Sequence, residues 1–302
     1  IIQGRQSTSD KKTWLNNKTG WNQTGSFILP SDVNAYFVDN NGADKGLRIE
    51  DLNSDGFPDL IQGWGGVRKA WLSNGSKFEE ETAWAPLIDF VTAAGADEGT
   101  QLADFNGDGK VDILQAKENG AVKKAYLNTG SGWKDVSSLW FSPINFSKND
   151  ASGSDYGARL VDVNADGLID ILQAYNFGTQ TRNAYLNNGS GWVKDNRFAP
   201  PDDFTTNSRL DNGIRLIDLN GDGLVDLLQD YANATTTDRD AWINNGTGWK
   251  VSTSWNSPEP FTSSGKNIGR RIGDVNGDGF GDIIIGYDTL KYTVIRNETF
   301  PY

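Results

Sequence analysis

The chain has 302 residues, enough for one large domain or two ordinary ones. Cys, His and Met are all absent, which excludes a disulfide framework, thiolate chemistry and histidine as a general base or metal ligand. The formal net charge of −12 argues against nucleic acid as a partner, since phosphate binding needs a basic surface. No apolar run approaches the ~20 residues that span a bilayer, so we expect no membrane span.

Short elements of four kinds follow one another along the chain and then recur. A strand and turn, "TWLNNKTGW", begins at Thr13. From Gly46 the order is a strand, "GLRIED", an acidic loop, a short apolar strand, a strand entering an Asn-Gly hairpin turn, and a last strand. The acidic loops begin at Asp51, Asp104, Asp162, Asp218 and Asp274, with separations of 53, 58, 56 and 56 residues.

This recurrence predicts an all-β fold of the β-propeller type. Four strands in a unit of about 55 residues are typical of a propeller blade, in which radial repetition leaves only short sheet edges. No stretch shows a helical period. A linear β-solenoid is the alternative, although its coils are usually shorter.

Six copies of the hairpin phrase and five acidic loops favour six blades in one domain, residues 1–302. Repeat units are expected to begin near residues 1, 46, 99, 157, 213 and 269. The first unit would lack its innermost strand. The last would depend on the N-terminus, or on further sequence, for closure. We expect the chain to be one part of a longer protein with flanking domains.

The acidic loop "DLNGDGLVD" has the residue pattern of a site for a hard cation. Asp218, Asn220 and Asp222 stand at positions one, three and five, where alternate side chains of a tight loop point inward, and Gly223 allows the sharp turn. The main-chain carbonyl at position seven and Asp226 at position nine complete a shell of oxygen atoms. Ca²⁺ accepts six to eight oxygens in flexible geometry, whereas Mg²⁺ tends to keep its waters. An EF-hand is excluded, because position twelve is Gln229 and no helices flank the loop.

Asp, Asn and Gly also form ordinary turns, so one copy would not decide between a turn and a metal site. All five copies keep Asp, Asn, Asp, Gly and Asp at positions one, three, five, six and nine, and carboxylates so close together repel without a cation. The sequence therefore predicts about five Ca²⁺ sites. Their ligands would be Asp51, Asn53, Asp55, Phe57 and Asp59; Asp104, Asn106, Asp108, Lys110 and Asp112; Asp162, Asn164, Asp166, Leu168 and Asp170; Asp218, Asn220, Asp222, Leu224 and Asp226; and Asp274, Asn276, Asp278, Phe280 and Asp282.

Three other residue types recur at fixed places. Arginines three residues before the first loop Asp could read an anionic ligand, but we favour pairing with neighbouring acidic loops or glutamines. A glutamine that ends the apolar strand is expected to satisfy backbone groups. An aromatic residue before each hairpin turn could stack on sugars, but core packing between blades is the better prediction. The series are Arg48, Arg159, Arg215 and Arg271, with Gln101 in the second unit; Gln3, Gln62, Gln115, Gln173 and Gln229; and Trp14, Trp71, Tyr126, Tyr185, Trp242 and Tyr292.

On its "DxNxDGxxD" loops and "LNNGSGW" turns, the chain resembles the FG-GAP or VCBS type of propeller repeat. Such repeats occur in integrin α heads, fungal propeller lectins and the shell proteins of bacterial toxin complexes. The resemblance covers nearly the whole chain and implies a Ca²⁺-stabilised propeller that serves as a binding or structural module. The Gly-Ala-Pro element of the integrin motif is absent, which weakens an integrin-like ligand role.

Three functions compete at this stage. We favour a non-catalytic, extracellular or cell-surface propeller that binds a protein or glycan ligand, because no motif stands outside the repeats. A carbohydrate-binding lectin is the alternative. A propeller lyase or glycosidase is a weaker third, because the one acidic cluster outside the pattern, Glu79, Glu80 and Glu81, is three adjacent residues that do not face one pocket.

Overall fold

The computed structural model describes residues 2–3, 11–16, 21–25, 27–30, 35–118, 123–151, 153–273, 281–287 and 291–295. The chain divides into two compact units: residues 1–154 with 189–191, and residues 155–188 with 192–302. Each is described by itself. Its regular structure consists of strands and three short 3₁₀ turns, and no helix in the described part is long and apolar enough to cross a membrane.

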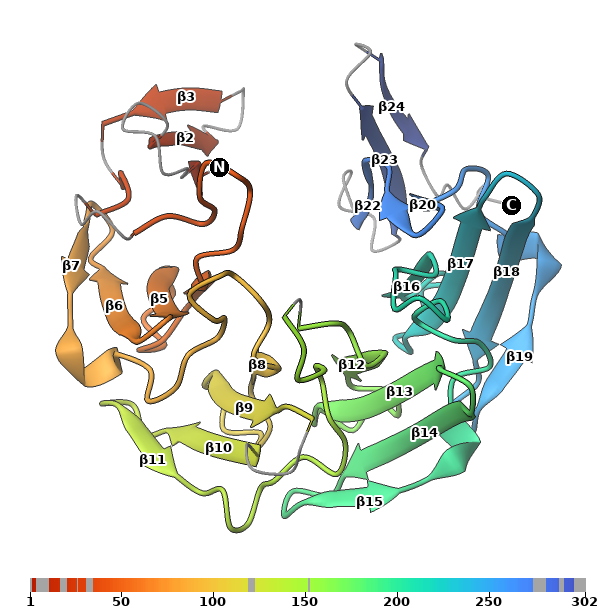
Figure 1. Cartoon of the computed structure of the whole chain (residues 1–302), viewed down its shortest axis with the longest axis horizontal. Helices are drawn as coiled ribbons and strands as arrows, with labels where there is room; N and C mark the ends of the chain where they lie inside the picture. Colours follow the sequence, from red (N-terminus) through yellow and green to blue (C-terminus); the bar gives the residue numbers. More distant parts are fainter. Residues whose placement is uncertain are drawn as a thin grey trace. The chain divides into compact units, whose positions relative to one another are not determined.

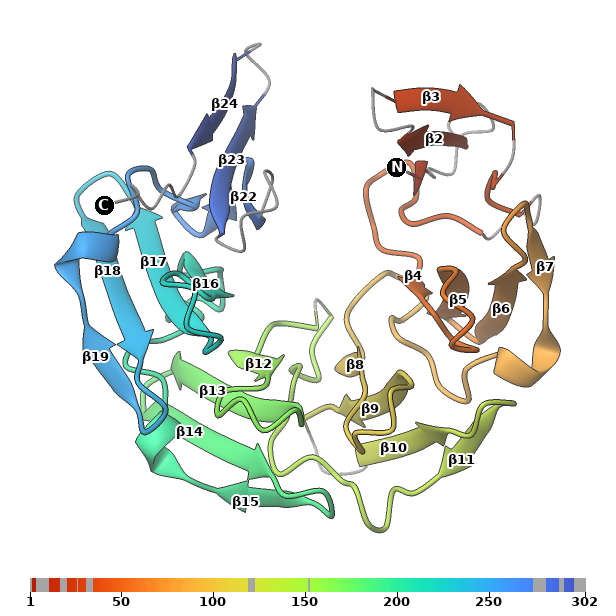
Figure 2. The ribbon, with the colours of Figure 1, turned by 180° about the vertical axis from the view of Figure 1, so that it is seen from behind.

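The first unit contains three antiparallel sheets (Figures 1 and 2). One has the order β1-β2-β3, the second β4-β5-β6-β7 and the third β8-β9-β10-β11. The strands are β1 (Ile2–Gln3), β2 (Lys12–Asn16), β3 (Trp21–Thr24), β4 (Leu47–Glu50), β5 (Asp59–Trp64), β6 (Val67–Ser73), β7 (Phe78–Glu80), β8 (Thr100–Ala103), β9 (Asp112–Ala116), β10 (Lys123–Asn128) and β11 (Trp133–Asp135). The 3₁₀ turn η1 (Thr82–Trp84) follows β7.

The second unit is built the same way (Figures 1 and 2). Its sheets run β12-β13-β14-β15, β16-β17-β18-β19 and β22-β23-β24, and a small hairpin, β20-β21, joins the end of β17 in parallel. The strands are β12 (Ala158–Val161), β13 (Asp170–Asn176), β14 (Gln180–Asn187), β15 (Trp192–Lys194), β16 (Ile214–Ile217), β17 (Asp226–Ala232), β18 (Thr237–Asn244), β19 (Trp249–Val251), β20 (Thr262–Ser263), β21 (Lys266–Asn267), β22 (Arg270–Gly273), β23 (Asp282–Tyr287) and β24 (Lys291–Ile295). The turns η2 (Asn196–Phe198) and η3 (Thr253–Trp255) follow β15 and β19.

The all-β propeller class is confirmed, but the predicted number of blades is wrong. Four sheets contain the four-stranded meander of a complete blade: β4–β7, β8–β11, β12–β15 and β16–β19. The other two sheets have three strands each in the described residues. Within the described residues, β1–β3 does not include a strand that precedes an acidic loop, and β22–β24 does not include a strand after the hairpin strand. Six copies of the hairpin phrase therefore correspond to four complete blades, because a phrase marks one strand and not a whole sheet.

A glycine before each first strand is required by close backbone contact. Gly157 has a φ of 62°, and a Cβ placed there would lie 2.2 Å from the Ala174 carbonyl oxygen in β13. Gly46, before β4, makes the same approach to Gly63 in β5. The "G" of "GLRIED" and its relatives therefore sets how the chain enters each blade.

The apolar cores lie between neighbouring sheets of a unit. Ile61 and Trp84 of one blade pack with Ile113 and Tyr126 of the next, and Leu172 packs with Trp242 in the second unit. Trp71, Tyr126 and Trp242 are all buried in such clusters, which confirms core packing for these members of the aromatic series.

The tryptophan that opens the last strand of a blade also joins two blades. The Trp133 indole N–H donates to the Trp84 carbonyl at 3.0 Å, and Trp249 donates to Phe198 at 3.0 Å. Each acceptor closes the 3₁₀ turn of the preceding blade. The "GW" of the hairpin phrase is thus explained by packing and one hydrogen bond.

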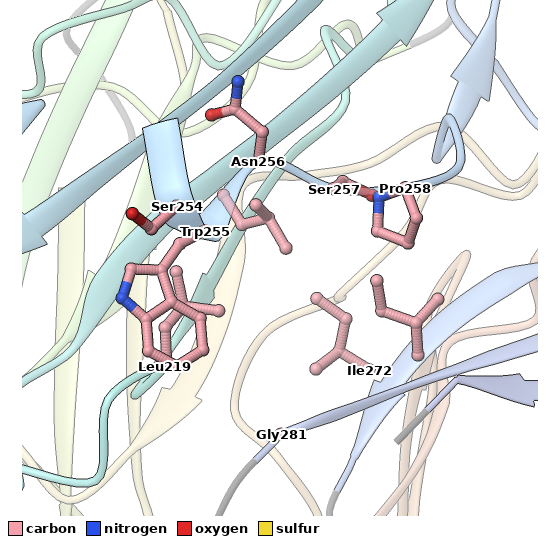
Figure 3. Close-up of a pocket in the computed structure, with 10 residues that line it drawn as sticks. Leu219, Ser254, Trp255, Asn256, Ser257, Pro258, Ile272 and Gly281 are labelled. Carbon is pink, nitrogen blue, oxygen red and sulfur yellow. The ribbon is translucent and has the colours of Figure 1, made fainter. Parts of the chain in front are cut away.

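An apolar cavity of about 200 Å³ lies between the blade β16–β19 and the sheet β22–β24. Figure 3 shows the Trp255 ring beside Leu219, with Ile272 and Pro258 across the space. Its walls are core side chains of the two sheets, so it belongs to the packing of this junction.

Candidate functional site

Each of the four described acidic loops is organised by its first aspartate. The two carboxylate oxygens of Asp218 accept backbone N–H groups from Gly221 at 2.7 Å and Gly223 at 2.8 Å. Gly223 has a φ of 85°, in the left-handed region that favours glycine, and has open space around it. Glycine at position six is therefore required by backbone conformation and not by crowding.

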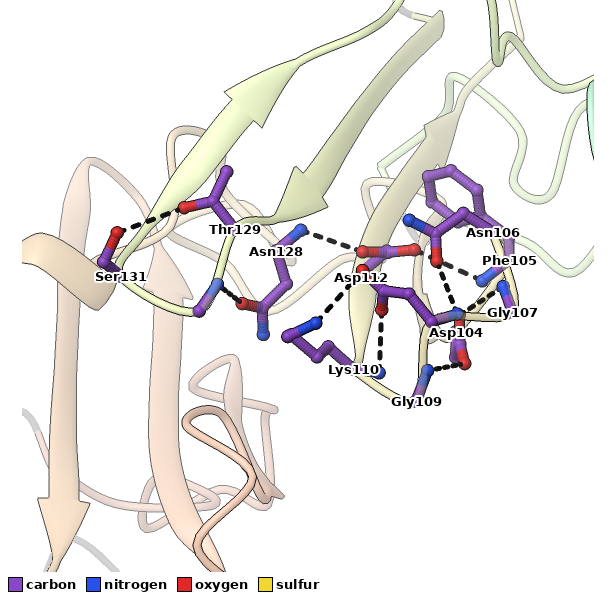
Figure 4. A network of polar contacts seen from close by, with 12 residues as sticks. Asp104, Phe105, Asn106, Gly107, Gly109, Lys110, Asp112, Asn128, Thr129 and Ser131 are labelled. Carbon is purple, nitrogen blue, oxygen red and sulfur yellow. Dashed lines mark hydrogen bonds and ion pairs between the residues drawn. The ribbon is translucent and has the colours of Figure 1, made fainter.

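The third and fifth positions bond to each other. In three loops the asparagine amide donates to the second carboxylate oxygen of the position-five aspartate, at 2.8 to 2.9 Å; the pairs are Asn53–Asp55, Asn164–Asp166 and Asn220–Asp222. In the loop that begins at Asp104 the corresponding oxygen of Asp108 receives the Lys110 ammonium instead, at 3.2 Å (Figure 4). In one of the four described loops, a lysine ammonium therefore pairs with the position-five aspartate.

The ninth position has a structural role that the sequence did not reveal. Asp112 is fully buried, and its two oxygens accept the backbone N–H groups of Phe105 at 3.3 Å and Asn128 at 2.8 Å (Figure 4). The same pair of bonds recurs in the other three described loops, at Asp59, Asp170 and Asp226. This aspartate therefore ties the start of its loop to the end of the third strand of the blade.

Burial raises the pKa of these ninth-position carboxyl groups. The pKa of Asp112 rises to about 7, and the pKa values of Asp170 and Asp226 rise to about 6. The nearby carboxylates at positions five and one raise them further, whereas the two backbone N–H groups act in the opposite direction. Three acidic groups in each loop are thus electrostatically coupled, and a cation would relieve their repulsion.

The loops are also hydrogen-bonded from one blade to the next. The Asn128 amide donates to the Leu52 carbonyl of the preceding blade at 2.7 Å, and Asn244 donates to Val163 at 2.7 Å. Leu52 and Val163 occupy the second position of their loops, and their N–H groups bond the ninth-position aspartates. In both units a continuous set of buried hydrogen bonds therefore links one acidic loop to the next.

The donor set of the loops fits a hard cation in its chemistry. Each offers two exposed carboxylates, an amide oxygen and a main-chain carbonyl, with no nitrogen or sulfur ligand. The ninth-position carboxylate lies behind them and is already hydrogen-bonded. In the described part of the chain, no three acidic side chains lie close enough together to enclose a metal ion. Calcium therefore remains a prediction.

Part of the fifth loop lies outside the described residues, namely Asp274, Asn276, Asp278 and Phe280. Asp282, its ninth position, begins β23 and is fully buried, as in the other loops.

The arginine series pairs with partners that were not predicted. Arg48 bonds Asp44, four residues earlier, through two contacts of 2.8 and 3.0 Å, and Arg215 bonds Asp211 in the same way. Arg159 pairs with Asp155 at 2.9 Å. These aspartates belong to the connectors that lead into each blade and not to the acidic loops. Sequence reasoning missed them, although an acid four residues before each of these arginines was visible.

The glutamine prediction is confirmed for three residues of the series. The Gln62 amide donates to the Lys45 carbonyl at 2.9 Å, and Gln115 donates to the Asp89 carbonyl at 3.0 Å. Gln229 donates to the Asn212 carbonyl at 3.3 Å. These three glutamines therefore fasten the second strand to connector backbone, whereas Gln173 accepts the side-chain amide of Asn183 at 3.4 Å.

The end of the blades opposite the acidic loops carries residues that do not repeat. In an antiparallel meander, the turn between strands one and two lies at one end and the turn between strands two and three at the other. At that other end, the residue before the glycine that precedes the first strand faces a residue near the end of the second strand, two positions after the repeated glutamine. We call these the variable pairs: Lys45 and Trp64, Glu98 and Lys117, Tyr156 and Tyr175, and Asn212 and Tyr231.

The variable pairs differ in chemistry from blade to blade. The Lys45 ammonium lies 3.9 Å from the centre of the Trp64 ring. Glu98 and Lys117 form an ion pair of 2.6 Å. The rings of Tyr156 and Tyr175 meet edge to face with centroids 5.6 Å apart. The same pair of positions therefore holds a cation over a ring in one blade, an ion pair in the next and two aromatic rings in the third.

The acidic cluster outside the repeats is accounted for by local ion pairs. Glu79 and Glu80 lie on β7 and pair with Lys77 at 2.6 Å and Lys69 at 3.2 Å. Glu81 follows the strand and precedes η1. These carboxylates are exposed and do not converge on a pocket.

Four-stranded antiparallel blades, each with an acidic loop between its first two strands, define an all-β propeller repeat protein. The FG-GAP-like repeat family matches residues 51–115, 104–173 and 162–229. These copies together cover more than half of the chain, which therefore belongs to this family. Among curated proteins, none matches the sequence at a significant level.

Two solved structures are similar in fold. A lectin of Agrocybe aegerita that recognises non-reducing terminal N-acetylglucosamine has a TM-score of 0.61 at 19% identity, over 94% of this chain and 73% of that chain. A chain of the Photorhabdus luminescens Tc holotoxin pore has a TM-score of 0.52 at 18% identity, over 97% of this chain and 13% of that chain. At these identities the likeness shows the fold alone.

Proposed function

We propose that this chain is a non-catalytic, calcium-stabilised binding or adhesion propeller of an extracellular or cell-surface protein. One observation carries the proposal: the two ends of the blades differ in how much they repeat. In all four described blades the acidic-loop end keeps the same residues at positions one, three, five, six and nine, and the same two backbone bonds to the ninth-position aspartate, whereas the opposite end carries four different variable pairs. A constant framework with a variable surface suits recognition, since function concentrates in loops held by a rigid scaffold.

Calcium would be held by the first, third and fifth side chains of each loop and by the seventh carbonyl. It would neutralise the coupled carboxylates and hold the turn closed. Two exposed carboxylates per loop suit the weak sites of extracellular modules, since affinity depends on the number of charged ligands. This supports a location outside the cell.

Two groups of acids in the described residues bear on a catalytic role. The off-pattern acids Glu79 and Glu80 are exposed and paired with lysines, and the ninth-position aspartates are each tied by two backbone N–H groups. This supports a binding role over a lyase or glycosidase.

Thermal unfolding in calcium and in EDTA tests the metal part of the proposal. A ligand that binds only the folded state stabilises it by about 2.7 kcal/mol per site at a concentration a hundred times its dissociation constant. EDTA should therefore lower the melting temperature sharply, and calcium but not magnesium should restore it. An unchanged melt would remove calcium from the proposal while leaving the binding role untouched.

A lectin is the second candidate, and two observations favour it. The structural neighbour from Agrocybe aegerita binds a sugar, and this chain has a polar cavity beside a tyrosine at one variable pair, Asn212 and Tyr231. A glycan array probed in calcium and in EDTA tests this candidate. Silence across the array in calcium would exclude it and leave a protein ligand.

A further inference from the structure

One variable pair does not fill its space. Lys45, Glu98 and Tyr156 each contact their partner on the second strand. Asn212 and Tyr231 instead both line an open cavity of about 370 Å³. The short Asn212 side chain turns away, since its amide donates to the Asp203 carbonyl at 2.8 Å. The cavity therefore exists because this pair combines a small side chain with a ring.

The walls come from two segments of the second unit. The connector 203–212 forms one wall, and the hairpin between β17 and β18 forms the other. Thr205 in the connector is 1% exposed, and its hydroxyl oxygen has no hydrogen-bond partner in the structure. Thr205 lines the cavity but its hydroxyl oxygen has almost no accessible surface, so a ligand would satisfy this group after a small shift of the connector.

The charge of the cavity is negative. Asp203 is matched by Arg182 at 3.1 Å, but Arg182 also holds Asp202 at 3.0 Å. Asp238 lines the cavity and pairs with no cation in the part of the chain that the structure describes. Burial, and then the charges of Asp202 and Asp238, raise the pKa of neighbouring Asp240. An acidic ligand would therefore be repelled.

Carboxylate and hydroxyl oxygens beside a half-buried ring suit one class of small molecule. Carboxylates accept hydrogen bonds from neighbouring hydroxyl groups, and the apolar face of a pyranose packs against an aromatic ring. We propose that this cavity binds one neutral sugar residue of a glycan, with hydroxyls bonded to Asp238 and Thr205 and the ring face against Tyr231, and that it rejects acidic sugars. The proposal rests on the lectin candidate and deepens it.

Among the four variable pairs, this one alone has a small side chain before the glycine. At the other three variable pairs the two side chains contact each other. Ser147 is the counterpart of Thr205 in the preceding connector and is likewise buried without a hydrogen bond at its hydroxyl. We therefore expect one sugar per chain and not one per blade.

A glycan panel followed by calorimetry tests the site. The full chain in calcium is first screened against neutral glycans ending in N-acetylglucosamine, galactose or mannose, and against sialylated and glucuronate-ended glycans. The best neutral monosaccharide is then titrated into the wild type and three variants. Thr205→Val and Asp238→Asn should each weaken binding about tenfold or more. Asn212→Tyr, which copies the filled pair at Tyr156, should abolish it.

Ser147→Ala is the matched control, because it removes the equivalent hydroxyl in the other unit, outside the residues that line the proposed site, and should leave binding unchanged. Melting temperatures within a few degrees of the wild type would show that the variants fold. Neutral binding that survives both Thr205→Val and Asn212→Tyr would overturn the site but keep the lectin. A preference for acidic glycans, or a stoichiometry near four, would also overturn it. Silence across the panel would remove lectin and site together.

Discussion

Lys110 is the only charged residue at the seventh position of the five acidic loops. Its ammonium lies 3.2 Å from Asp108, on the oxygen that an asparagine amide holds in the other described loops. A calcium ion must displace it, so we predict that Lys110→Leu strengthens calcium binding at this loop. The gain should be up to about fivefold, since half-exposed ion pairs contribute up to about 1 kcal/mol.

Calorimetric titration of calcium into the wild type and Lys110→Leu measures the change. The reverse substitution, Leu224→Lys, provides the control and should weaken one site by a similar factor. Identical isotherms for Lys110→Leu and the wild type would show that the lysine does not compete.

Asp230 is an acid at a place where other blades have a small residue, Ala116 or Ala174. It is fully buried, and burial raises its pKa to about 6, while Arg239 at 3.1 Å acts in the opposite direction. A carboxyl group whose pKa is raised by folding favours the folded state when protonated, so its contribution is lost as the pH rises from about 4 to about 6. Asp230→Ala should remove this pH-dependent loss of stability.

Denaturant unfolding between pH 4.5 and pH 7.5, at fixed free calcium, tests the effect. The free energy of unfolding of the variant, relative to that of the wild type, should increase as the pH rises, by on the order of 2 to 3 kcal/mol. Asp238→Ala, on the exposed part of the neighbouring strand, should show no such trend. A constant difference across the pH range would contradict the assignment to Asp230.

At the scale of elements, a single substitution can break the buried hydrogen bonds between blades. Asn128→Ala would leave the Leu52 carbonyl without its donor, and Asn244→Ala would do the same to Val163. Each should lower the free energy of unfolding by about 1 to 3 kcal/mol, the cost of an unsatisfied buried polar group. Chemical denaturation measures it, and Lys134→Ala, on the exposed strand after the same hairpin, is the control. Losses no larger than that of the control would mean that the carbonyls find other donors.

The sequence predicted what repeats and failed where a contact uses backbone groups or joins residues that only the fold brings together. The strands, the turn glycines and the packing of Trp71 and Trp242 followed from patterns present in every unit. The burial of Asp112 did not, because its partners are backbone groups that no residue type reveals. The variable pairs were missed for a related reason. Lys45 and Trp64 are 19 positions apart in the sequence, and their facing depends on the meander and on the close approach of Gly46.

At the scale of the whole molecule, four blades share one framework, and the question is whether their metal sites act independently. The position-five aspartate lies on the exposed side of its loop, whereas the bonds between blades run through the second and ninth positions. Asp222→Ala should therefore remove one calcium per chain, leave the other predicted sites filled, and loosen only the loop of β16–β19. Its exposed bonds, to Asn220 and to the Leu224 N–H, are local to that loop.

Calcium stoichiometry by calorimetry, with hydrogen exchange of the backbone, separates local from global effects. About four sites instead of five, with faster exchange confined to residues 218–226, is the expected result. The contrasting variant is Asn244→Ala, which breaks the bond from β18 to the preceding loop and should lower the affinity of both loops it touches. Loss of all sites in Asp222→Ala would show that the buried bonds transmit the state of one loop to every other. The blades would then bind calcium as a cooperative unit, and the constant end of the propeller would be a single switch.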